Sequence, residues 1–258
     1  MNSTTEEIFK LKITNDKTTA KKAFGEFKKS KYSQNGEDGV IQEILNRLGD
    51  NVSDKFFVEF GGWDGLHLSN TANLRRHYDW KGILLEGNSA KVESMKDKSL
   101  NLYCEFLTSS NINEVFSKYN VPNEFGVLSI DIDSDDIYIF EAISEKYRPD
   151  LIVIECNPGL PNHVPIRIIE GKANVKNGYF NANLNDIYNV GISKGYEFVT
   201  TVAFNAFFVR QEIFSKLNIE KLNKEDVLLI HDRDNAKSFW ENKIIQHNDT
   251  WVINSGKI

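Results

Sequence analysis

The chain has 258 residues, 40% of them hydrophobic, which is enough for a real core in one large domain or two small ones. Its formal net charge of −6, with no cluster of lysine and arginine, argues against a nucleic-acid partner. The N-terminal residues lack the features of a signal peptide, and no apolar segment approaches the roughly 20 residues that cross a bilayer. We therefore expect a cytoplasmic protein without membrane insertion.

Residues 1–30 are polar and rich in lysine, and we interpret them as an N-terminal arm. From Gly39 to Leu48 the apolar residues recur at helical spacing, and Gly49 follows as a C-cap, so this segment is predicted to be a helix. Asn35 and Asp38 are both candidates for its N-cap.

After this helix, short apolar runs alternate with helical patterns, which is typical of a parallel sheet covered by helices on both faces. Only residues 203–205 join the last two runs, too few for a helical crossover, so these runs should pair antiparallel. The prediction is an α/β, Rossmann-like fold whose seven-stranded sheet is mostly parallel, with a C-terminal antiparallel strand. The predicted strands span 56–60, 83–85, 102–107, 127–132, 151–156, 198–202 and 206–209, and the predicted helices span 69–78, 89–96, 112–119, 136–146 and 183–194.

Residues 159–182 break this alternation, because they contain several prolines and glycines and show little periodicity. They follow the carboxyl end of a predicted strand, where ligands of open α/β sheets bind. We interpret them as an insertion that covers the substrate, with a plain surface insertion as the alternative. The main domain is then expected over 31–210, and the polar residues 211–258 as a helical extension packed on it.

The most informative segment is FFVEFGGWDG, residues 56–65, in which an apolar run ends in a carboxylate followed by two glycines. Glycines after a strand let the backbone turn tightly and approach a ligand that a Cβ would exclude. The next run, GILLEGN over residues 82–88, ends in Glu86. An acid roughly 20 residues beyond the glycines is placed to accept both hydrogen bonds of a ribose diol. The two segments together predict a pocket for an adenosine-type ligand.

Acidic residues crowd the ends of the fourth and fifth predicted strands, where VLSIDIDSDD carries Asp131 and Asp133 and LIVIECNPG carries Glu155. Neighbouring strand ends are about 5 Å apart, so these carboxylates should repel one another unless a cation lies among them. Ligand sets made only of oxygen favour Mg²⁺ or Mn²⁺. We therefore predict a metal site at Asp131, Asp133 and Glu155, whereas Asp135 and Asp136 have helix capping as their simpler explanation.

His163, in the irregular segment after Glu155, is a candidate general base or metal ligand, with an ordinary loop residue as the alternative. The spacings allow no Ser-His-Asp or Cys-His arrangement. No Walker A lysine follows the glycines, which argues against hydrolysis of a nucleoside triphosphate.

Four blocks between Tyr32 and Arg210 carry a resemblance to a known family: YSQNGEDG, FVEFGGWDGLHLSNTANL, W-K-GILLEGN and LSIDIDSDD. In this order they resemble class I S-adenosylmethionine-dependent methyltransferases, and among these the FkbM family of sugar O-methyltransferases. Two details depart from the family pattern. FGGWDG stands where many members have Gly-x-x-Gly with an alanine or asparagine inside, and Ser134 stands where many have glycine.

The resemblance implies residues that frame the methionine end of the cofactor, residues that bind the ribose hydroxyls, and a helix start that meets the cofactor carboxylate. These implied cofactor-binding residues are Gln34, Glu59, Gly61, Gly62, Asp64, Asn70, Glu86 and Asn88. Metal-dependent enzymes of this fold hold the ion at the ends of the fourth and fifth strands. The resemblance thus agrees with the metal ligands predicted from spacing.

We therefore expect a methyltransferase that uses S-adenosyl-L-methionine and a divalent cation to methylate a sugar hydroxyl. The expected acceptor is a nucleotide-sugar or another glycan precursor of capsule or surface-polysaccharide assembly. Asp133, Asp136 and His163 are unranked candidates for the catalytic base. The oligomeric state is left open, a homo-oligomer included.

The main alternative is a metal-dependent glycosyltransferase, because Asp131-Ile132-Asp133 is an Asp-x-Asp pattern of the kind that holds Mn²⁺ against a nucleotide-sugar. A nicotinamide-dependent oxidoreductase is disfavoured by the missing G-x-G-x-x-G. A non-catalytic module that binds the cofactor without turnover is the third alternative.

Overall fold

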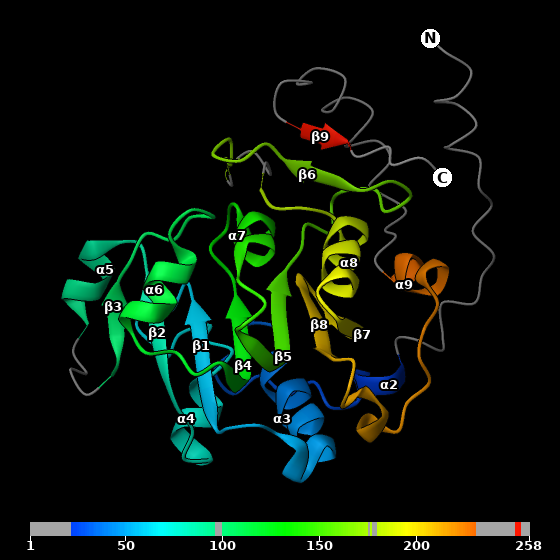
Figure 1. The fold of residues 1–258 in the computed structure, drawn as a ribbon, viewed down its shortest axis with the longest axis horizontal. Coiled ribbons are helices and arrows are strands. Elements are labelled where there is room, and N and C mark those ends of the chain that lie inside the picture. The colour runs from blue at the N-terminus through cyan, green and yellow to red at the C-terminus, as the bar shows by residue number, and fades with distance from the viewer. Residues whose placement is uncertain (1–21, 96–99, 175, 177–179, 231–250, 254–258) are drawn as a thin grey trace.

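The protein is described from a computed structural model, which covers residues 22–95, 100–174, 176, 180–230 and 251–253. Its centre is a seven-stranded sheet in the order β3-β2-β1-β4-β5-β8-β7 (Figure 1). The strands are β1 (Phe56–Phe60), β2 (Lys81–Glu86), β3 (Leu102–Cys104), β4 (Glu124–Ile130), β5 (Arg148–Glu155), β7 (Tyr196–Val202) and β8 (Asn205–Arg210).

Strands β1 to β5 pair in parallel, whereas β8 is antiparallel to both of its neighbours, β5 and β7. This confirms the predicted α/β, Rossmann-like fold with one antiparallel strand near the C-terminal edge. The strand order reverses direction between β1 and β4, so the carboxyl ends of these two strands flank a crevice of the kind where ligands of open α/β sheets bind.

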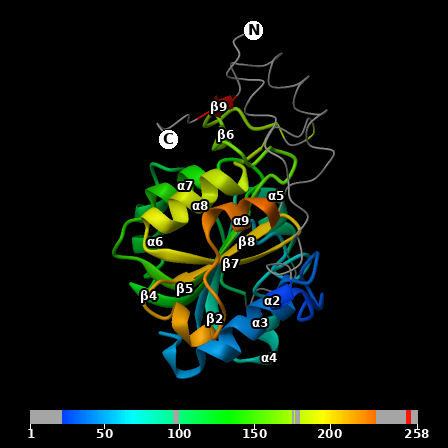
Figure 2. The ribbon, with the colours of Figure 1, turned by 90° about the vertical axis from the view of Figure 1, so that its right-hand side faces the viewer.

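Helices cover both faces of the sheet, as the continuous apolar strands require (Figures 1 and 2). One face packs against α6 (Ile112–Lys118), α7 (Asp136–Ala142), α8 (Leu184–Ser193) and α9 (Lys224–Ile230). The other packs against α2 (Lys22–Gly25), α3 (Glu37–Leu48), α4 (Ala72–His77) and the short helix η3 (Phe214–Leu217). Two further short elements, η1 (Gly49–Asn51) and α5 (Ser89–Ser94), follow α3 and β2.

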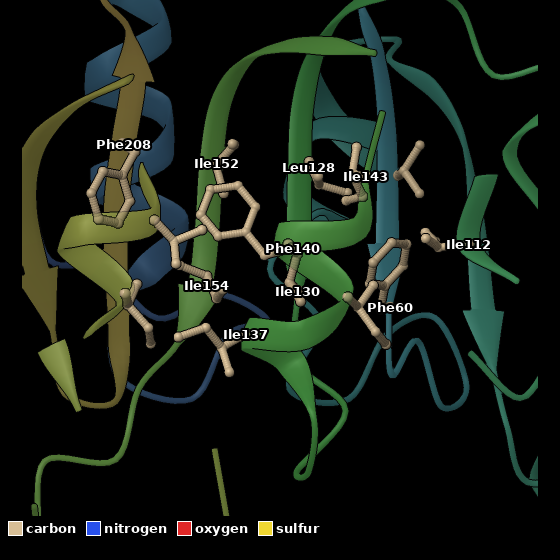
Figure 3. Close-up of a cluster of buried hydrophobic side chains, with 14 of the residues drawn as sticks. Phe60, Ile112, Leu128, Ile130, Ile137, Phe140, Ile143, Ile152, Ile154 and Phe208 are labelled. Carbon is tan, nitrogen blue, oxygen red and sulfur yellow. The ribbon is translucent and has the colours of Figure 1, made fainter. Parts of the chain in front are cut away.

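Successive residues of one strand supply the two cores, because side chains alternate across a strand. Val58 and Phe60 belong to the first core, whereas Phe57 belongs to the second. Figure 3 shows the first core, where Ile137 and Phe140 of α7 lie against Ile130, Ile152 and Ile154 of the sheet and Ile112 packs beside Phe60. The side chains of both cores are buried, and their packing fixes the position of the sheet edge that carries the polar residues.

The predicted insertion and the C-terminal extension come together in a second sheet, which the sequence did not predict. β6 (Ile166–Ile168) pairs antiparallel with β9 (Trp251–Ile253), above the carboxyl edge of the main sheet (Figure 1). Leu160, Ile166, Ile168 and Trp251 form a small core between them. The prediction of a helical extension is therefore wrong at β9, while residues 231–250 lie outside the described residues.

A buried arginine fastens this second sheet to the helices below it. Arg167 of β6 donates two hydrogen bonds to Asp186 of α8, at 2.6 and 2.9 Å, and two to Glu141 of α7, at 2.7 and 2.8 Å. Arg167 and Asp186 are buried, whereas Glu141 is exposed. The β6 part of the insertion is thus held against α7 and α8 by these four hydrogen bonds.

Most of the predicted arm, residues 1–21, also lies outside the described residues, and α2 occupies its end. The domain boundaries themselves stay predictions. Within the part of the chain that the structure describes, no helix combines the length and the apolar character needed to cross a membrane.

Candidate active site

The loops at the carboxyl edge of the sheet enclose a cavity of about 1180 Å³. Its lining comes from the start of α3, from the loops after β1 to β4, and from the end of β5 beside the start of β8. Of the residues predicted to form the site, those that line the cavity are Gln34, Gly61, Asn70, Glu86, Asn88, Asp131, Asp133 and Glu155. Those that do not are Glu59, Gly62, Asp64, Asp136 and His163.

The two glycines after β1 form the predicted tight turn. Gly61 has a φ of +71°, and a Cβ there would overlap the carbonyl oxygen of Asp131. The N–H groups of Gly61 and Gly62 both donate to the carbonyl oxygen of Leu85, at 2.9 and 3.3 Å. A Cβ on Gly62 would come within 2.8 Å of the Leu84 Cβ. The turn is therefore pressed between β2 and β4, and only glycine fits at its first position.

Glu59, at the end of β1, holds the next loop rather than facing the cavity. Its carboxylate accepts hydrogen bonds from the Ser69 hydroxyl at 2.7 Å, the Asn70 N–H at 2.7 Å and the Thr71 hydroxyl. Burial raises the pKa of Glu59 above its ordinary value, although these donors act in the opposite direction. The bonds bring Asn70 to the cavity wall, and a direct contact between Glu59 and the cofactor stays a prediction.

Helix α4 begins at Ala72 and not at Ser69 as predicted, and the Ser69 hydroxyl accepts the Ala72 N–H at 3.0 Å. Asp64 is also occupied locally, since it accepts the N–H groups of Leu66 and His67 at 2.9 and 2.7 Å. Asp64 therefore stabilises its own turn. It does not line the cavity, and its contact with the cofactor stays a prediction.

Glu86 closes β2 and lines one end of the cavity. One carboxylate oxygen accepts the Asn88 N–H at 2.9 Å, and the other accepts the Trp63 N–H at 3.1 Å. Lys91 lies 3.7 Å from Glu86 and 4.9 Å from the centre of the Trp63 ring. Two backbone donors thus fix the carboxylate in place, and its remaining lone pairs are available to a ligand.

Two exposed aromatic rings accompany Glu86 at this end. Trp63 is 40% exposed and Phe106, in the loop after β3, is 76% exposed, and both line the cavity. Neither residue was predicted from the sequence as part of the site. The predicted strand over 102–107 ends at Cys104, so residues 105–108 form part of the cavity wall instead of continuing the sheet.

The acids after β4 and β5 meet at the other end of the cavity. One carboxylate oxygen from each of Asp131, Asp133 and Glu155 lies within 4.8 Å of the other two. Burial, followed by the charges of Asp136 and Asp133, raises the pKa of Asp131 well above its usual range. The pKa of Glu155 is raised likewise, by burial and then by Asp131. These shifts indicate a site that is costly to keep ionised without a cation.

Asp136 is not part of this set of three and closes the β4–α7 turn. Its carboxylate oxygens accept the N–H groups of Ile132 at 2.9 Å and Ser134 at 3.1 Å, and the side chain is fully buried. Burial raises the pKa of Asp136 to about 6. The N-cap of α7 is Asp135, which makes no side-chain cap hydrogen bond, and Asp136 binds the N–H groups of the preceding turn, so the helix-capping explanation given above is wrong for Asp136. His163 is exposed, and neither it nor Asp136 lines the cavity, so a role as catalytic base stays a prediction for both.

Two buried residues complete the acidic end, and the sequence analysis missed both of them. Glu37 opens α3 and accepts the Asn35 N–H at 2.7 Å, and the Asn205 side-chain amide donates to it at 3.2 Å. Asn205 is the first residue of β8 and pairs in register with Glu155. Only Glu37 carried a signal, because it lies within the YSQNGEDG block.

The YSQNGEDG block forms a loop that delivers Gln34 and Glu37 to the cavity. Asp38 accepts three successive backbone N–H groups, from Lys31 at 2.7 Å, Tyr32 at 2.6 Å and Ser33 at 3.1 Å. Helix α3 begins at Glu37 and its N-cap is Gly36, without a side-chain cap hydrogen bond, so the predictions of Asn35 and Asp38 as the N-cap are both wrong.

The insertion also reaches the cavity. Glu170 and Gly171, which follow β6, belong to its lining, and the Gly171 N–H lies 3.1 Å from both carboxylate oxygens of Asp135. Ser109, after β3, donates to Glu170. The segment thus bridges the loops of β3 and β4, and whether it covers a substrate stays a prediction.

No protein-family model and no curated protein matches the sequence. Among solved structures, a SAM-dependent methyltransferase from Archaeoglobus fulgidus is 12% identical over 84% of this chain and 90% of its own, with a TM-score of 0.38. LepI, solved in complex with SAM, is 14% identical over 66% of this chain and 46% of its own, with a TM-score of 0.33. Likeness at this level says nothing about activity, and the fold is assigned here from the strand order alone.

Proposed function

We propose that this protein is an S-adenosylmethionine-dependent O-methyltransferase that acts on a sugar hydroxyl and uses a divalent cation. The observation that carries the proposal is the arrangement of one cavity with two unlike ends. Glu86, the glycine turn and two exposed aromatic rings lie at one end, and the oxygen cluster of Asp131, Asp133 and Glu155 lies at the other. A ligand that joins a nucleoside to a reactive group would span them.

The first end suits the nucleoside of the cofactor. Glu86 is held by two backbone donors, so its free lone pairs can accept the two ribose hydroxyls without reorganisation. Trp63 and Phe106 offer apolar ring surface to an adenine base. The cofactor supplies a methyl carbon made electrophilic by the sulfonium charge, so the tasks left to the protein are alignment and proton removal.

The second end has the donor set that a hard cation requires. Among the described residues, Glu155 Oε2 and Asn205 Oδ1 are buried oxygen atoms without a hydrogen-bond partner, beside the cluster of three acids. Asp131, Asp133 and Glu155 would hold a Mg²⁺ or Mn²⁺ ion, and Asn205 lies next to them. Such an ion acts as a Lewis acid that lowers the pKa of a bound hydroxyl.

Asp133 is the best placed of the three proposed bases, because it is the one that lines the cavity. Its φ of +59° places it on a tight bend, exposed at the end of β4. A carboxylate that gives one oxygen to a cation keeps a second oxygen for the proton of the sugar hydroxyl. We assign proton removal to Asp133 and a structural role to Asp136.

Calorimetry with S-adenosylhomocysteine tests the nucleoside end. The wild-type chain should bind it, and Glu86→Ala should weaken binding at least about 10-fold, the 1.4 kcal/mol of one hydrogen bond to a charged group. Glu93→Ala, an exposed acid on the neighbouring α5, is the matched control and should bind like wild type. Tighter binding of UDP or GDP than of S-adenosylhomocysteine would favour the glycosyltransferase alternative.

Transfer of a labelled methyl group to a panel of sugars tests the second end. Glu155→Ala and Asp133→Ala should each lose activity in added Mg²⁺ or Mn²⁺, and EDTA should inhibit the wild-type enzyme. Glu145→Ala, an exposed acid outside the cavity, serves as the control. Full activity in both site variants, together with no effect of EDTA, would remove the cation from the proposal.

A further inference from the structure

The geometry points to an acceptor that enters the cavity as an uncharged, hydroxyl-bearing glycosyl unit, with no phosphate inside the cavity. This inference rests on the proposed function and names the acceptor class of the same site. It differs from the nucleotide-activated sugar that the sequence led us to expect.

The charge of the cavity is the first reason. Eight of its lining residues are aspartate or glutamate, whereas lysine appears once and arginine not at all among the described lining residues. The lysine is Lys91, which is already engaged by Glu86 and the Trp63 ring at the β2 end of the cavity. A phosphate near β4 and β5 would therefore meet several carboxylates and no described cationic side chain, and like charges in a concave site repel strongly.

The unpartnered oxygens are the second, independent reason. Glu155 and Asn205 are 8% and 6% exposed, and Glu155 Oε2 and Asn205 Oδ1 have no hydrogen-bond partner among the described residues. The amide nitrogen of Asn205 donates to Glu37, which leaves its oxygen for a ligand. A buried acceptor without a donor is costly. The proposed cation would satisfy Glu155, whereas Asn205 Oδ1, outside the predicted ligand set, still requires an N–H or O–H donor. A sugar hydroxyl can donate to Asn205, whereas an ionised phosphate group is rich in acceptors.

A divalent cation and the cofactor do not reverse the charge. The cation brings +2 and the sulfonium cofactor a net +1, which together remain below the number of acids around the cavity. Asp135 and Glu170 line the wall on the side of the insertion, and neither belongs to the predicted ligand set. The excess of acidic side chains around the cavity also argues against a nucleotide-sugar, which is the donor that the alternative glycosyltransferase would require.

The test is calorimetry on the full chain, saturated with S-adenosylhomocysteine and Mg²⁺. The probes are the methyl glycosides of glucose, galactose and mannose, each compared with its 6-phosphate and with the nucleotide-linked form of the same sugar. At least one glycoside should bind about tenfold or more tightly than both of its phosphorylated partners. The ratio should shrink as NaCl is raised, because salt screens charge. A panel in which no glycoside binds more tightly than its phosphorylated partners overturns the inference.

Charge reversal on the cavity wall separates electrostatics from shape. Glu170→Lys should reduce the preference for the neutral sugar at least threefold, whereas Glu220→Lys, an exposed acid outside the cavity, should leave it unchanged. An unchanged preference in Glu170→Lys would show that charge does not select the acceptor. The binding of S-adenosylhomocysteine, measured first, distinguishes failure of the proposed function from failure of this inference. Failure to bind S-adenosylhomocysteine defeats the proposed function, and tighter binding of phosphorylated sugars with normal cofactor binding defeats only this inference.

Discussion

Glu59 allows the sharpest test of how this site is held together. Its buried carboxylate accepts hydrogen bonds from Ser69, Asn70 and Thr71, and so fixes the loop that lines the cavity. Glu59→Ala leaves these three donors without their acceptor, each at a cost of about 1–3 kcal/mol, part of which the two hydroxyls recover by turning elsewhere. We expect a net loss of about 3–5 kcal/mol, a large share of the roughly 5–15 kcal/mol that stabilises a domain.

Glu59→Gln should behave quite differently. The amide oxygen can still accept the Asn70 N–H, and the amide nitrogen can donate to the hydroxyls of Ser69 and Thr71, since a hydroxyl both donates and accepts. Because burial raises the pKa of Glu59, the wild-type chain loses stability as the pH rises from the unfolded-state pKa through the folded-state pKa. Glutamine does not titrate, so the stability of the Gln variant relative to wild type should increase over that pH range. At neutral pH the free energies of unfolding of the two proteins should differ by no more than about 1 kcal/mol.

Urea denaturation followed by the fluorescence of the four tryptophans measures both variants against wild type. An Ala variant within about 1 kcal/mol of wild type, or a Gln variant as unstable as the Ala variant, would refute this account of the loop. Binding of S-adenosylhomocysteine adds a second outcome. If Gln keeps stability but loses binding, Glu59 contacts the cofactor directly, as the family resemblance implies.

Three further changes follow from other contacts. Gly61→Ala should lower stability by about 3 kcal/mol or more in a melting experiment, because its φ of +71° and the overlap of its Cβ with the carbonyl oxygen of Asp131 both oppose a side chain. Asp38→Ala should cost about 1–3 kcal/mol in urea denaturation, since it removes the single oxygen that serves three backbone donors, and Asn46→Ala on the exposed face of α3 should cost less than about 0.5 kcal/mol. Arg167→Leu should cost about 3–5 kcal/mol by leaving a buried Asp186 unpaired. Truncation of its exposed partner, Glu141→Ala, should cost about 1 kcal/mol or less.

The central sheet could be predicted because each strand is an apolar run with its own local boundaries. Strands β1, β2, β4 and β5 are buried along almost their whole length, and the short link at residues 203–205 forces the last two strands to pair antiparallel. β6 and β9 could not be predicted in this way. Each has three residues, too few to show a period of two, and they pair across more than 80 positions of sequence. Only the fold brings them together.

The cavity lining was predictable where a motif coincides with a strand end, as at Gly61, Glu86 and the acids after β4 and β5. It was not predictable where side chains compete for the same donors. Asp64 and Asp136 have the right type and place for ligands, yet nearby backbone N–H groups occupy both of them. Aspartate after a strand serves a turn as readily as a ligand, and the sequence does not distinguish the two.

Asn205 shows a more general reason why part of this site escapes sequence analysis. Ligand residues of an α/β sheet are sought at the carboxyl ends of its strands, because parallel strands all end at one edge. β8 runs the other way, so its first residue, and not its last, lies beside the end of β5. The antiparallel strand thereby places a neutral amide oxygen next to Glu155, where a parallel strand would have contributed its final residue. The Asn205 amide nitrogen donates a hydrogen bond to Glu37, and its oxygen has no hydrogen-bond partner among the described residues. The reversal of a single strand therefore gives the acidic end of the cavity an uncharged acceptor, and in this fold the start of the antiparallel strand belongs in the search for site residues.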